Sequence, residues 1–266
     1  MTTQEPGIER VRRHLTMIGA ASLCRFKDRY LERRLQSRCR ARGVPDLEAY
    51  ADLLDRDPDE GSRLLSAVAL GVTSFFRNPT AWRSLGQLVT AECRARGAEC
   101  RAWSAACSTG EEAWSLAFLL DGLTREGLLS GWLVDATDLD PRSLEVARNG
   151  EYGDRCLPAI EAVIALGAGG RLPGRFVVPK SLRESVRFSV ADLSVPAARG
   201  PYDVVLCRNV LMYFDLEAQR EVMNAAIAAL RLGGFLMLGK AELATFDLLA
   251  RLELVDRRER IYRRTG

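Results

Sequence analysis

The stretch from Trp103 to Glu112, WSAACSTGEE, holds the residues whose types and spacing most clearly suggest chemistry. Small residues in its turn would let a ligand approach the backbone, and the helix predicted to begin at Glu111 offers unpaired N–H groups. The two carboxylates of Glu111 and Glu112 suit a helix start but would repel a phosphate. The turn therefore favours a ligand with hydroxyls or positive charge, although an ordinary strand–helix turn would look the same.

The elements that position this turn alternate between strand and helix from Cys100 onward. The predicted strands are residues 100–106, 133–137, 186–190, 202–207 and 235–238. Helices are predicted over 111–122, from Pro141 and after Asp215, and a closing antiparallel pair over 252–255 and 260–262. This alternation predicts an α/β fold with a mostly parallel sheet.

Polar side chains follow several of these predicted strands. They are Asp138, Asp192 and the pair Arg208-Asn209, and with the turn before Glu112 they belong to one edge of the sheet, where ligands of open parallel sheets bind. Asp138 follows Gly110 at about the interval expected for an acid that binds ribose hydroxyls. Since the G-x-G-x-x-G pattern is absent and the turn is acidic, a pyrophosphate cofactor is disfavoured. A nucleoside that carries a sulfonium, S-adenosylmethionine (SAM), suits the site better.

The first 70 residues show only helical spacing and predict a small helical domain. Residues 25–42 hold eight basic against two acidic side chains, a net charge of +6, whereas the whole chain carries only +3. A solvated face and a surface that docks an acidic partner both fit this basic helix. The imbalance is local, so we expect no nucleic-acid binding.

Two further stretches interrupt the pattern. Gly71 to Asn78 is either a linker fixed by the pair Phe75-Phe76 or a lid with Arg77 pointing at an anion. After Pro79 a helix is predicted up to Gly97. Residues 153–182 fit the alternation poorly and are interpreted as an insertion, a small antiparallel subdomain with a short strand at 176–178.

Composition limits the class of protein. The 266 residues are 47% hydrophobic and 27% charged, as in soluble globular proteins, and no apolar run is long enough for membrane insertion. The seven cysteines are scattered without a C-x-x-C pair, which disfavours a disulfide framework or a metal site and favours the cytoplasm. The only histidine, His14, lies in a polar segment, so histidine-based catalysis is excluded.

Four motifs in order resemble the chemotaxis-receptor protein-glutamate methyltransferases of the CheR type. They are residues 73–77 (TSFFR), 104–112 (SAACSTGEE), 136–140 (ATDLD) and 207–214 (CRNVLMYF). The resemblance covers nearly the whole chain and includes the basic helix and the insertion. It implies a Rossmann-like SAM methyltransferase sheet with a helical N-terminal docking domain over 1–70, a linker and helix over 71–98 and the methyltransferase domain over 99–266.

The resemblance also assigns roles to residues. The SAM pocket would be lined by Thr73, Arg77, Glu112, Asp138, the pair Asp192-Leu193 and the pair Arg208-Asn209. Glu112 would contact the amino group or a neighbouring polar atom, Asp138 the ribose hydroxyls, and Asp192 with Leu193 the adenine. Arg77 and Tyr213 would lie near the transferred methyl group as the catalytic residues. No metal is implied.

By resemblance, the substrate is the glutamate side chains of a chemoreceptor, converted to methyl esters in chemosensory adaptation. A glutamate is ionised at neutral pH, with an ordinary pKa of about 4.3, so its carboxylate needs no general base. The enzyme would be a cytoplasmic monomer that docks the receptor's helical cytoplasmic region through the basic helix. Two departures from the family pattern are Gly71, where the family often has asparagine, and Lys240-Ala241-Glu242, where it commonly has His-Ser-Glu.

Two other functions fit the same residues. One is a cofactor-binding signalling adaptor with weak or no catalysis, for which Gly71 and Lys240 are the discriminating positions. The other is a methyltransferase for a small carboxylic acid, whose activity would survive deletion of residues 1–70.

Overall fold

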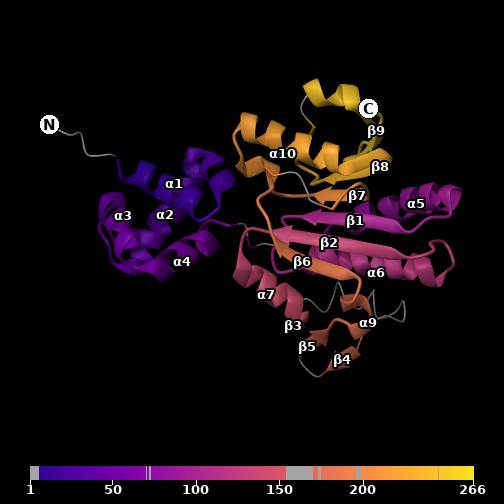
Figure 1. The fold of residues 1–266 in the computed structure, drawn as a ribbon, viewed down its shortest axis with the longest axis horizontal. Helices are drawn as coiled ribbons and strands as arrows, with labels where there is room; N and C mark the ends of the chain where they lie inside the picture. The colour runs from indigo at the N-terminus through magenta and orange to yellow at the C-terminus, as the bar shows by residue number, and fades with distance from the viewer. Residues whose placement is uncertain are drawn as a thin grey trace.

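The centre of the molecule is a twisted sheet, whose strands lie side by side across Figure 1. The computed structural model describes residues 6–69, 71, 73–153, 170–172, 175–195, 199–244 and 246–266, and within these the sheet has seven strands. Their spatial order is β6 (Val186–Val190), β2 (Trp132–Asp138), β1 (Cys100–Ala105), β7 (Tyr202–Cys207), β8 (Leu230–Leu238), β10 (Ile261–Arg264) and β9 (Leu252–Asp256).

Neighbouring strands are parallel from β6 to β8, and β10 is antiparallel to both β8 and β9. From β1 the chain first builds outward through β2 to β6 and then returns to add β7 and β8 on the other side. The order therefore reverses between β1 and β7, and a crevice at such a point binds ligands in open α/β sheets. The predicted fold class and the closing antiparallel pair are confirmed.

Both faces of the sheet are covered, as the all-buried strand β7 requires. Val204 and Leu206 pack in the core that includes α5 (Pro79–Arg96) and α6 (Glu111–Arg125). α7 (Pro141–Asn149) packs beside α6, where Leu144 meets Ala113. Val205 and Cys207 point the other way, into the core that contains α10 (Leu216–Ala229).

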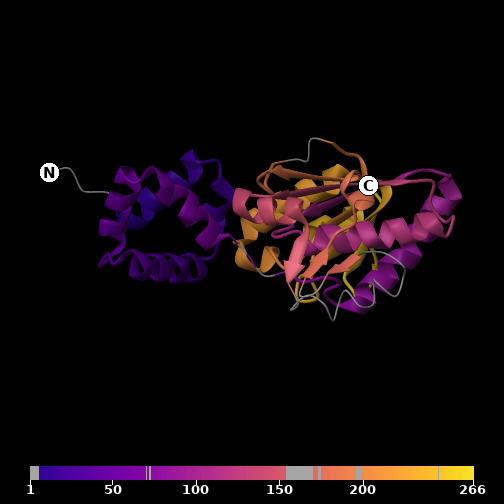
Figure 2. The same cartoon turned by 90° about the horizontal axis from the view of Figure 1, so that it is seen from below.

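The N-terminal segment, residues 7–69, is built of helices and is called the helical part below. It consists of α1 (Gly7–Met17), the short 3-10 helix η1 (Ala21–Arg25), α2 (Asp28–Arg42), α3 (Leu47–Arg56) and α4 (Pro58–Val68). Asp46 and Asp57 cap α3 and α4 through hydrogen bonds to the backbone N–H groups of Ala49 and Asp59. In Figures 1 and 2 it lies beside one end of the sheet.

Two predicted boundaries were wrong. The basic helix begins at Asp28 rather than residue 25, because Arg25 ends η1 and Phe26 forms an isolated bridge with Phe214. The strand expected at 235–238 begins at Leu230, since Arg231 bonds to Asp203 of the adjacent strand and draws this segment into the sheet.

A small antiparallel sheet follows α7, in the order β3 (Glu151–Gly153), β5 (Arg175–Val177) and β4 (Gly170–Leu172). After it, α9 (Lys180–Arg183) leads into β6. The predicted insertion is thus an antiparallel subdomain that begins at Glu151, although residues 154–169 and 173–174 of it lie outside the described residues. Phe75 packs edge-on against Tyr152 and Phe176 of this sheet, with ring centroids 4.9 and 5.9 Å away. Among the described residues, no helix has the length and apolar character needed to cross a membrane.

Candidate functional site

The turn between β1 and α6 brings the backbone close to the crevice. Ala106, Ser108 and Gly110 all have positive φ values, 60°, 51° and 95°. At Gly110 a side chain is also excluded by space, since a Cβ there would lie 2.7 Å from the Cβ of Ala147. The Tyr152 hydroxyl donates to the carbonyl of Thr109 at 2.7 Å. The small residues therefore allow the tight turn that starts α6 at Glu111.

Glu112, in the first turn of α6, forms a buried ion pair with Arg208, which follows β7. The Arg208 Nη1 lies 3.2 Å from Glu112 Oε2, and the Ser104 hydroxyl donates to Oε1 at 2.9 Å. The two side chains are 12% and 2% exposed. Burial raises the pKa of Glu112, and the positive charge of Arg208 opposes that rise.

Arg208 also connects this site to the segment before α5. Its Nη2 donates to the carbonyl oxygen of Arg77 at 2.8 Å and to Oδ1 of Asn78 at 3.2 Å. The guanidinium lies over the Trp82 ring, 5.5 Å from its centroid. Its buried Nε has no hydrogen-bond partner among the described residues.

Asp138, the last residue of β2, is 8% exposed. It accepts hydrogen bonds from the backbone N–H groups of Ser108 at 2.8 Å and Asp140 at 2.9 Å, one on each oxygen. Burial raises the pKa of Asp138, while these bonds act against it. Each oxygen keeps a lone pair for a further donor, so Asp138 could still accept from a ligand hydroxyl.

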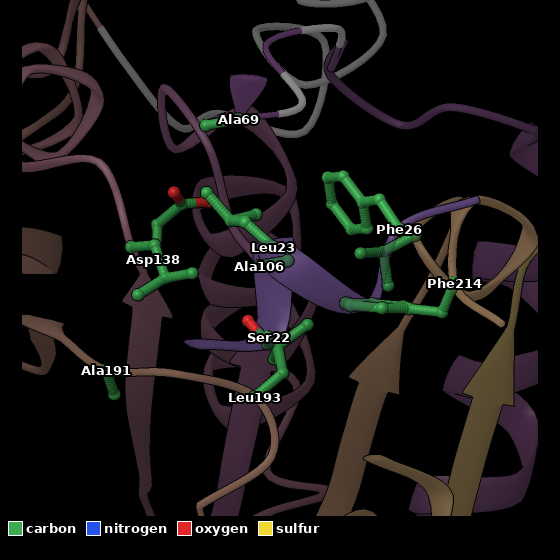
Figure 3. Close-up of a pocket in the computed structure, with 11 residues that line it drawn as sticks. Ser22, Leu23, Phe26, Ala69, Ala106, Asp138, Ala191, Leu193 and Phe214 are labelled. Atoms are coloured by element: carbon green, nitrogen blue, oxygen red, sulfur yellow. The ribbon is translucent and has the colours of Figure 1, made fainter. Parts of the chain in front are cut away.

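Two adjoining chambers lie at the carboxyl ends of these strands. The first is a hollow of about 380 Å³, counting the part that is open to solvent, and it is lined by Ser22, Leu23, Phe26, Ala69, Ala106, Asp138, Leu139, Ala191, Leu193, Val210 and Phe214. We call it the apolar chamber (Figure 3). The second is a hollow of about 430 Å³, again counting the part that is open to solvent, and it is lined by Thr73, Ser74, Arg77, Ala106, Ser108, Glu112, Arg208, Asn209 and Val210. We call it the polar chamber, and it shares Ala106 and Val210 with the first.

Most residues that the sequence singled out meet here. Those in the polar chamber are Thr73, Arg77, Glu112, Arg208 and Asn209, and those in the apolar chamber are Asp138 and Leu193. The structure thus joins positions from the linker, the first turn of α6, the end of β2 and the loops after β6 and β7. Their individual roles in binding stay predictions.

Asp192 and Tyr213 are absent from both linings, because each contacts the helical part instead. Asp192 Oδ2 accepts from the backbone N–H of Ser22 at 3.0 Å, and its Oδ1 accepts from the N–H and the hydroxyl of Ser194. The Tyr213 ring lies 4.7 Å from that of Tyr30 on α2.

Sequence reasoning missed the residues that the helical part adds to the apolar chamber, namely Ser22, Leu23, Phe26 and Ala69. Leu23 and Phe26 lie beside the start of the basic stretch, and their apolar character fits the buried face of a helix equally well. Their spacing carries no signal for a wall shared with the sheet.

The two departures from the family pattern have different surroundings. Lys240 Nζ lies 3.3 Å from the buried carboxylate of Glu259, so it pairs within the β9–β10 end of the sheet. Glu242 accepts from the backbone N–H groups of Asn209 and Gly239 at 2.8 and 2.7 Å and thereby shapes the loop after β7. Gly71 has open space where a side chain would begin. Neither Gly71 nor Lys240 is among the described residues that line the two chambers.

Comparison with curated proteins gives relatives of similar identity but different length. The chain is 30% identical over 232 residues to an uncharacterized 104.1 kDa protein of Rhodobacter capsulatus, covering 86% of this chain and 24% of that protein. It is 36% identical over 231 residues to a probable biofilm formation methyltransferase WspC of Pseudomonas putida, covering 84% and 52%. It is 32% identical over 230 residues to a chemotaxis protein methyltransferase of Klebsiella aerogenes, covering 83% and 77%. The chain therefore spans about half or less of the length of the first two.

Two protein-family models match the two structural parts in order. Residues 26–69 match the model described as CheR methyltransferase, all-alpha domain. Residues 71–259 match the model described as CheR methyltransferase, SAM binding domain, which is the part that contains β1, β2, β6 and β7 and both chamber linings on the sheet side. By these matches the chain belongs to the CheR methyltransferase family, and its cofactor is SAM.

Proposed function

We propose that this chain transfers a methyl group from SAM to glutamate side chains of a chemoreceptor, giving glutamyl methyl esters in chemosensory adaptation. The observation that carries the proposal is the pairing of chambers: a polar chamber lined by Arg77, Glu112 and Arg208 opens beside an apolar one that ends at Asp138. Family membership and the similarity to a chemotaxis protein methyltransferase support it.

The residues present fit SAM. The apolar chamber offers the walls that an adenine ring needs, and Asp138 has acceptor capacity left for ribose hydroxyls. In the polar chamber, Ser108 Oγ and Arg208 Nε are buried without partners among the described residues. A buried polar group without a partner costs about 1–3 kcal/mol, so a ligand with its own polar end would be stabilised there. The amino-acid end of SAM has both a carboxylate and an ammonium group, and Glu112 would hold the latter.

When bound, SAM supplies a methyl group activated by a sulfonium. The chain's own task is then to position the acceptor, because an ionised glutamate needs no base. We propose that Arg77 and Tyr213 hold the acceptor carboxylate without protonating it. Arg77 lines the polar chamber, and Tyr213 lies in the same short loop as Asn209 and Val210 of its wall.

We further propose that the exposed side of α2 docks the cytoplasmic helical region of the receptor. Several arginines of the stretch 25–42 are engaged within the chain: Arg25 with Asp215, Glu217 and Glu221, Arg38 with Glu60, and Arg42 with Asp57 and Glu60. Arg29, Arg33 and Arg40 are exposed, and their spacing places them on one side of the helix. We therefore assign the proposed docking surface to Arg29, Arg33 and Arg40 rather than to the whole basic stretch. The free state of the described cysteines supports a reducing cytoplasm as the site of action.

The test is transfer of labelled methyl from SAM to a purified receptor cytoplasmic fragment in a single turnover. We expect base-labile label in the receptor, and none in a fragment whose acceptor glutamates are changed to glutamine. Arg77→Ala should reduce transfer on the order of 100-fold, because the acceptor loses its position. Arg83→Ala, an exposed arginine on α5, serves as the matched control.

Absence of receptor label in the wild type, with cofactor binding intact, would contradict the enzyme proposal. The signalling-adaptor function would then account for the same binding data. Label that appears in a small carboxylic acid and not in the receptor would instead support a methyltransferase for small carboxylic acids.

A further inference from the structure

The apolar chamber is closed on one side by the helical part. Ser22, Leu23, Phe26 and Ala69 form this wall, opposite Asp138 and Ala191 on the sheet side. Figure 3 shows Ser22 between the Asp138 side of the chamber and the Phe26–Phe214 side. The chamber is therefore a joint product of two segments that are distant in the sequence.

Ser22 is the one polar side chain that the helical part brings to this lining. It is 4% exposed, and its Oγ has no hydrogen-bond partner among the described residues. Its surroundings are mainly apolar, so the hydroxyl has lost water without gaining a partner. Leaving a buried hydroxyl in this state is unfavourable unless a ligand completes it.

The position of Ser22 is fixed by bonds between the two parts on either side of it. Its backbone N–H donates to Asp192 Oδ2, and Asp192 is itself held by Ser194. Three residues later, Arg25 donates through Nε and Nη2 to both carboxylate oxygens of Asp215, at 2.9 and 3.1 Å. The hydroxyl is therefore presented to the chamber by a preformed arrangement.

We propose that Ser22 binds the nucleoside of SAM through its hydroxyl, so that the helical part contributes a cofactor contact and is held in place by the cofactor. A serine hydroxyl both donates and accepts, which matches the mixed donors and acceptors at the edge of adenine. The inference rests on SAM occupying these chambers and does not depend on which carboxylate is methylated.

A coupling follows from this shared wall. Any bond that holds the helical part against the sheet also holds Ser22 in the chamber. Loss of such a bond should therefore lower the affinity for the cofactor. Arg25 tests this relationship because it contacts Asp215, Glu217 and Glu221 and does not line either chamber.

The experiment measures the dissociation constant of S-adenosylhomocysteine for the full chain by calorimetry, without receptor. Ser22→Ala keeps the backbone bond to Asp192 and should weaken binding roughly two- to tenfold, as expected for one neutral hydrogen bond. Ser62→Ala, an exposed serine on α4, is the matched control and should bind as the wild type does. Thermal unfolding without ligand verifies that each variant folds.

Arg25→Ala should likewise weaken binding, while Arg56→Ala, an exposed arginine on α3, should not. Wild-type affinity in Ser22→Ala would overturn the contact, and wild-type affinity in Arg25→Ala would overturn the coupling. If the wild type itself fails to bind S-adenosylhomocysteine, the proposed function falls together with this inference. If binding behaves as expected but no receptor is labelled, only the proposed function fails.

Discussion

Glu112 of α6 and Arg208 after β7 form a buried ion pair whose closest atoms lie 3.2 Å apart. The pair joins the first helix after the crevice to the fourth strand of the parallel set, and Arg208 continues to the carbonyl of Arg77. A buried charge without its partner is costly, so the two residues depend on each other. The polar chamber therefore has a charged wall whose two side chains stabilise each other.

Glu112 is the first residue to change. Glu112→Ala would leave Arg208 buried and unpaired, and we expect the free energy of unfolding to fall by about 3–5 kcal/mol, together with loss of S-adenosylhomocysteine binding. Glu112→Gln keeps the shape and one acceptor, so its stability loss should be smaller while binding still weakens. Denaturant unfolding and calorimetry measure the two effects. Glu111→Gln is the matched control, since Glu111 lies outside both linings. Equal loss of affinity in that control would contradict the assignment.

Cofactor binding should depend on pH through Asp138. Burial raises the pKa of Asp138 and of Glu112, so both take up protons at a higher pH than ordinary carboxyl groups. Only the ionised forms suit ribose hydroxyls and an ammonium group, and affinity should therefore fall as the pH is lowered from about 7 to about 5. Asp138→Asn should bind weakly at every pH and show a flatter profile. Asp121→Asn, on the middle of α6, should keep the wild-type profile; an unchanged profile in Asp138→Asn would refute the role.

Tyr213 can be tested by removing its hydroxyl alone. Tyr213→Phe keeps the ring contact with Tyr30, whose centroid lies 4.7 Å away. If the hydroxyl holds the acceptor carboxylate, methyl transfer should slow on the order of 10- to 100-fold at unchanged S-adenosylhomocysteine affinity. Tyr30→Phe removes the hydroxyl from the other ring of the pair and is the comparison. Wild-type transfer by Tyr213→Phe would assign Tyr213 to packing against the helical part.

Charge reversal on α2 tests receptor docking. Arg34 is unsuited because its Nε donates to the hydroxyl of Tyr30, so we choose Arg29→Glu with Arg33→Glu. This double variant should raise the KM for receptor several-fold at low salt and less at high salt, with unchanged cofactor affinity. Arg257→Glu with Arg258→Glu makes the same change of net charge on the exposed β9–β10 turn. A similar rise of KM in that control would show a general charge effect and contradict a specific surface.

The positions of several site residues on the sheet could be predicted, because the sequence signals for them lie within short stretches of the chain. Glu112 starts a helix, while Asp138 and Arg208 each follow a buried strand, and the carboxyl ends of parallel strands meet at one edge. These three local patterns were thus enough to predict that the residues lie at the same edge, where they line the two adjoining chambers.

The chamber wall from the helical part and the start of β8 could not be predicted, because both depend on contacts between residues that are distant in the sequence. Ser22 meets Asp192 at a separation of 170 residues, and Arg25 meets Asp215 at 190. No periodicity in residues 20–26 distinguishes a wall over a cofactor from a face of a helix. The same holds for the start of β8, where Arg231 bonds to Asp203 across 28 residues and draws the segment before residue 235 into the sheet.

The shared wall changes what truncation of this protein can reveal. A chain that starts at Gly71 would lose Ser22, Leu23, Phe26 and Ala69 and would open Leu193, Val210 and Phe214 to water. Its loss of activity could follow from damage to the apolar chamber as well as from a missing receptor contact. Deletion of residues 1–70 therefore does not distinguish a small-molecule methyltransferase from a receptor-specific one. Because both segments line the same chamber, transplanting either onto another member of the family would require both halves of the interface to be exchanged together.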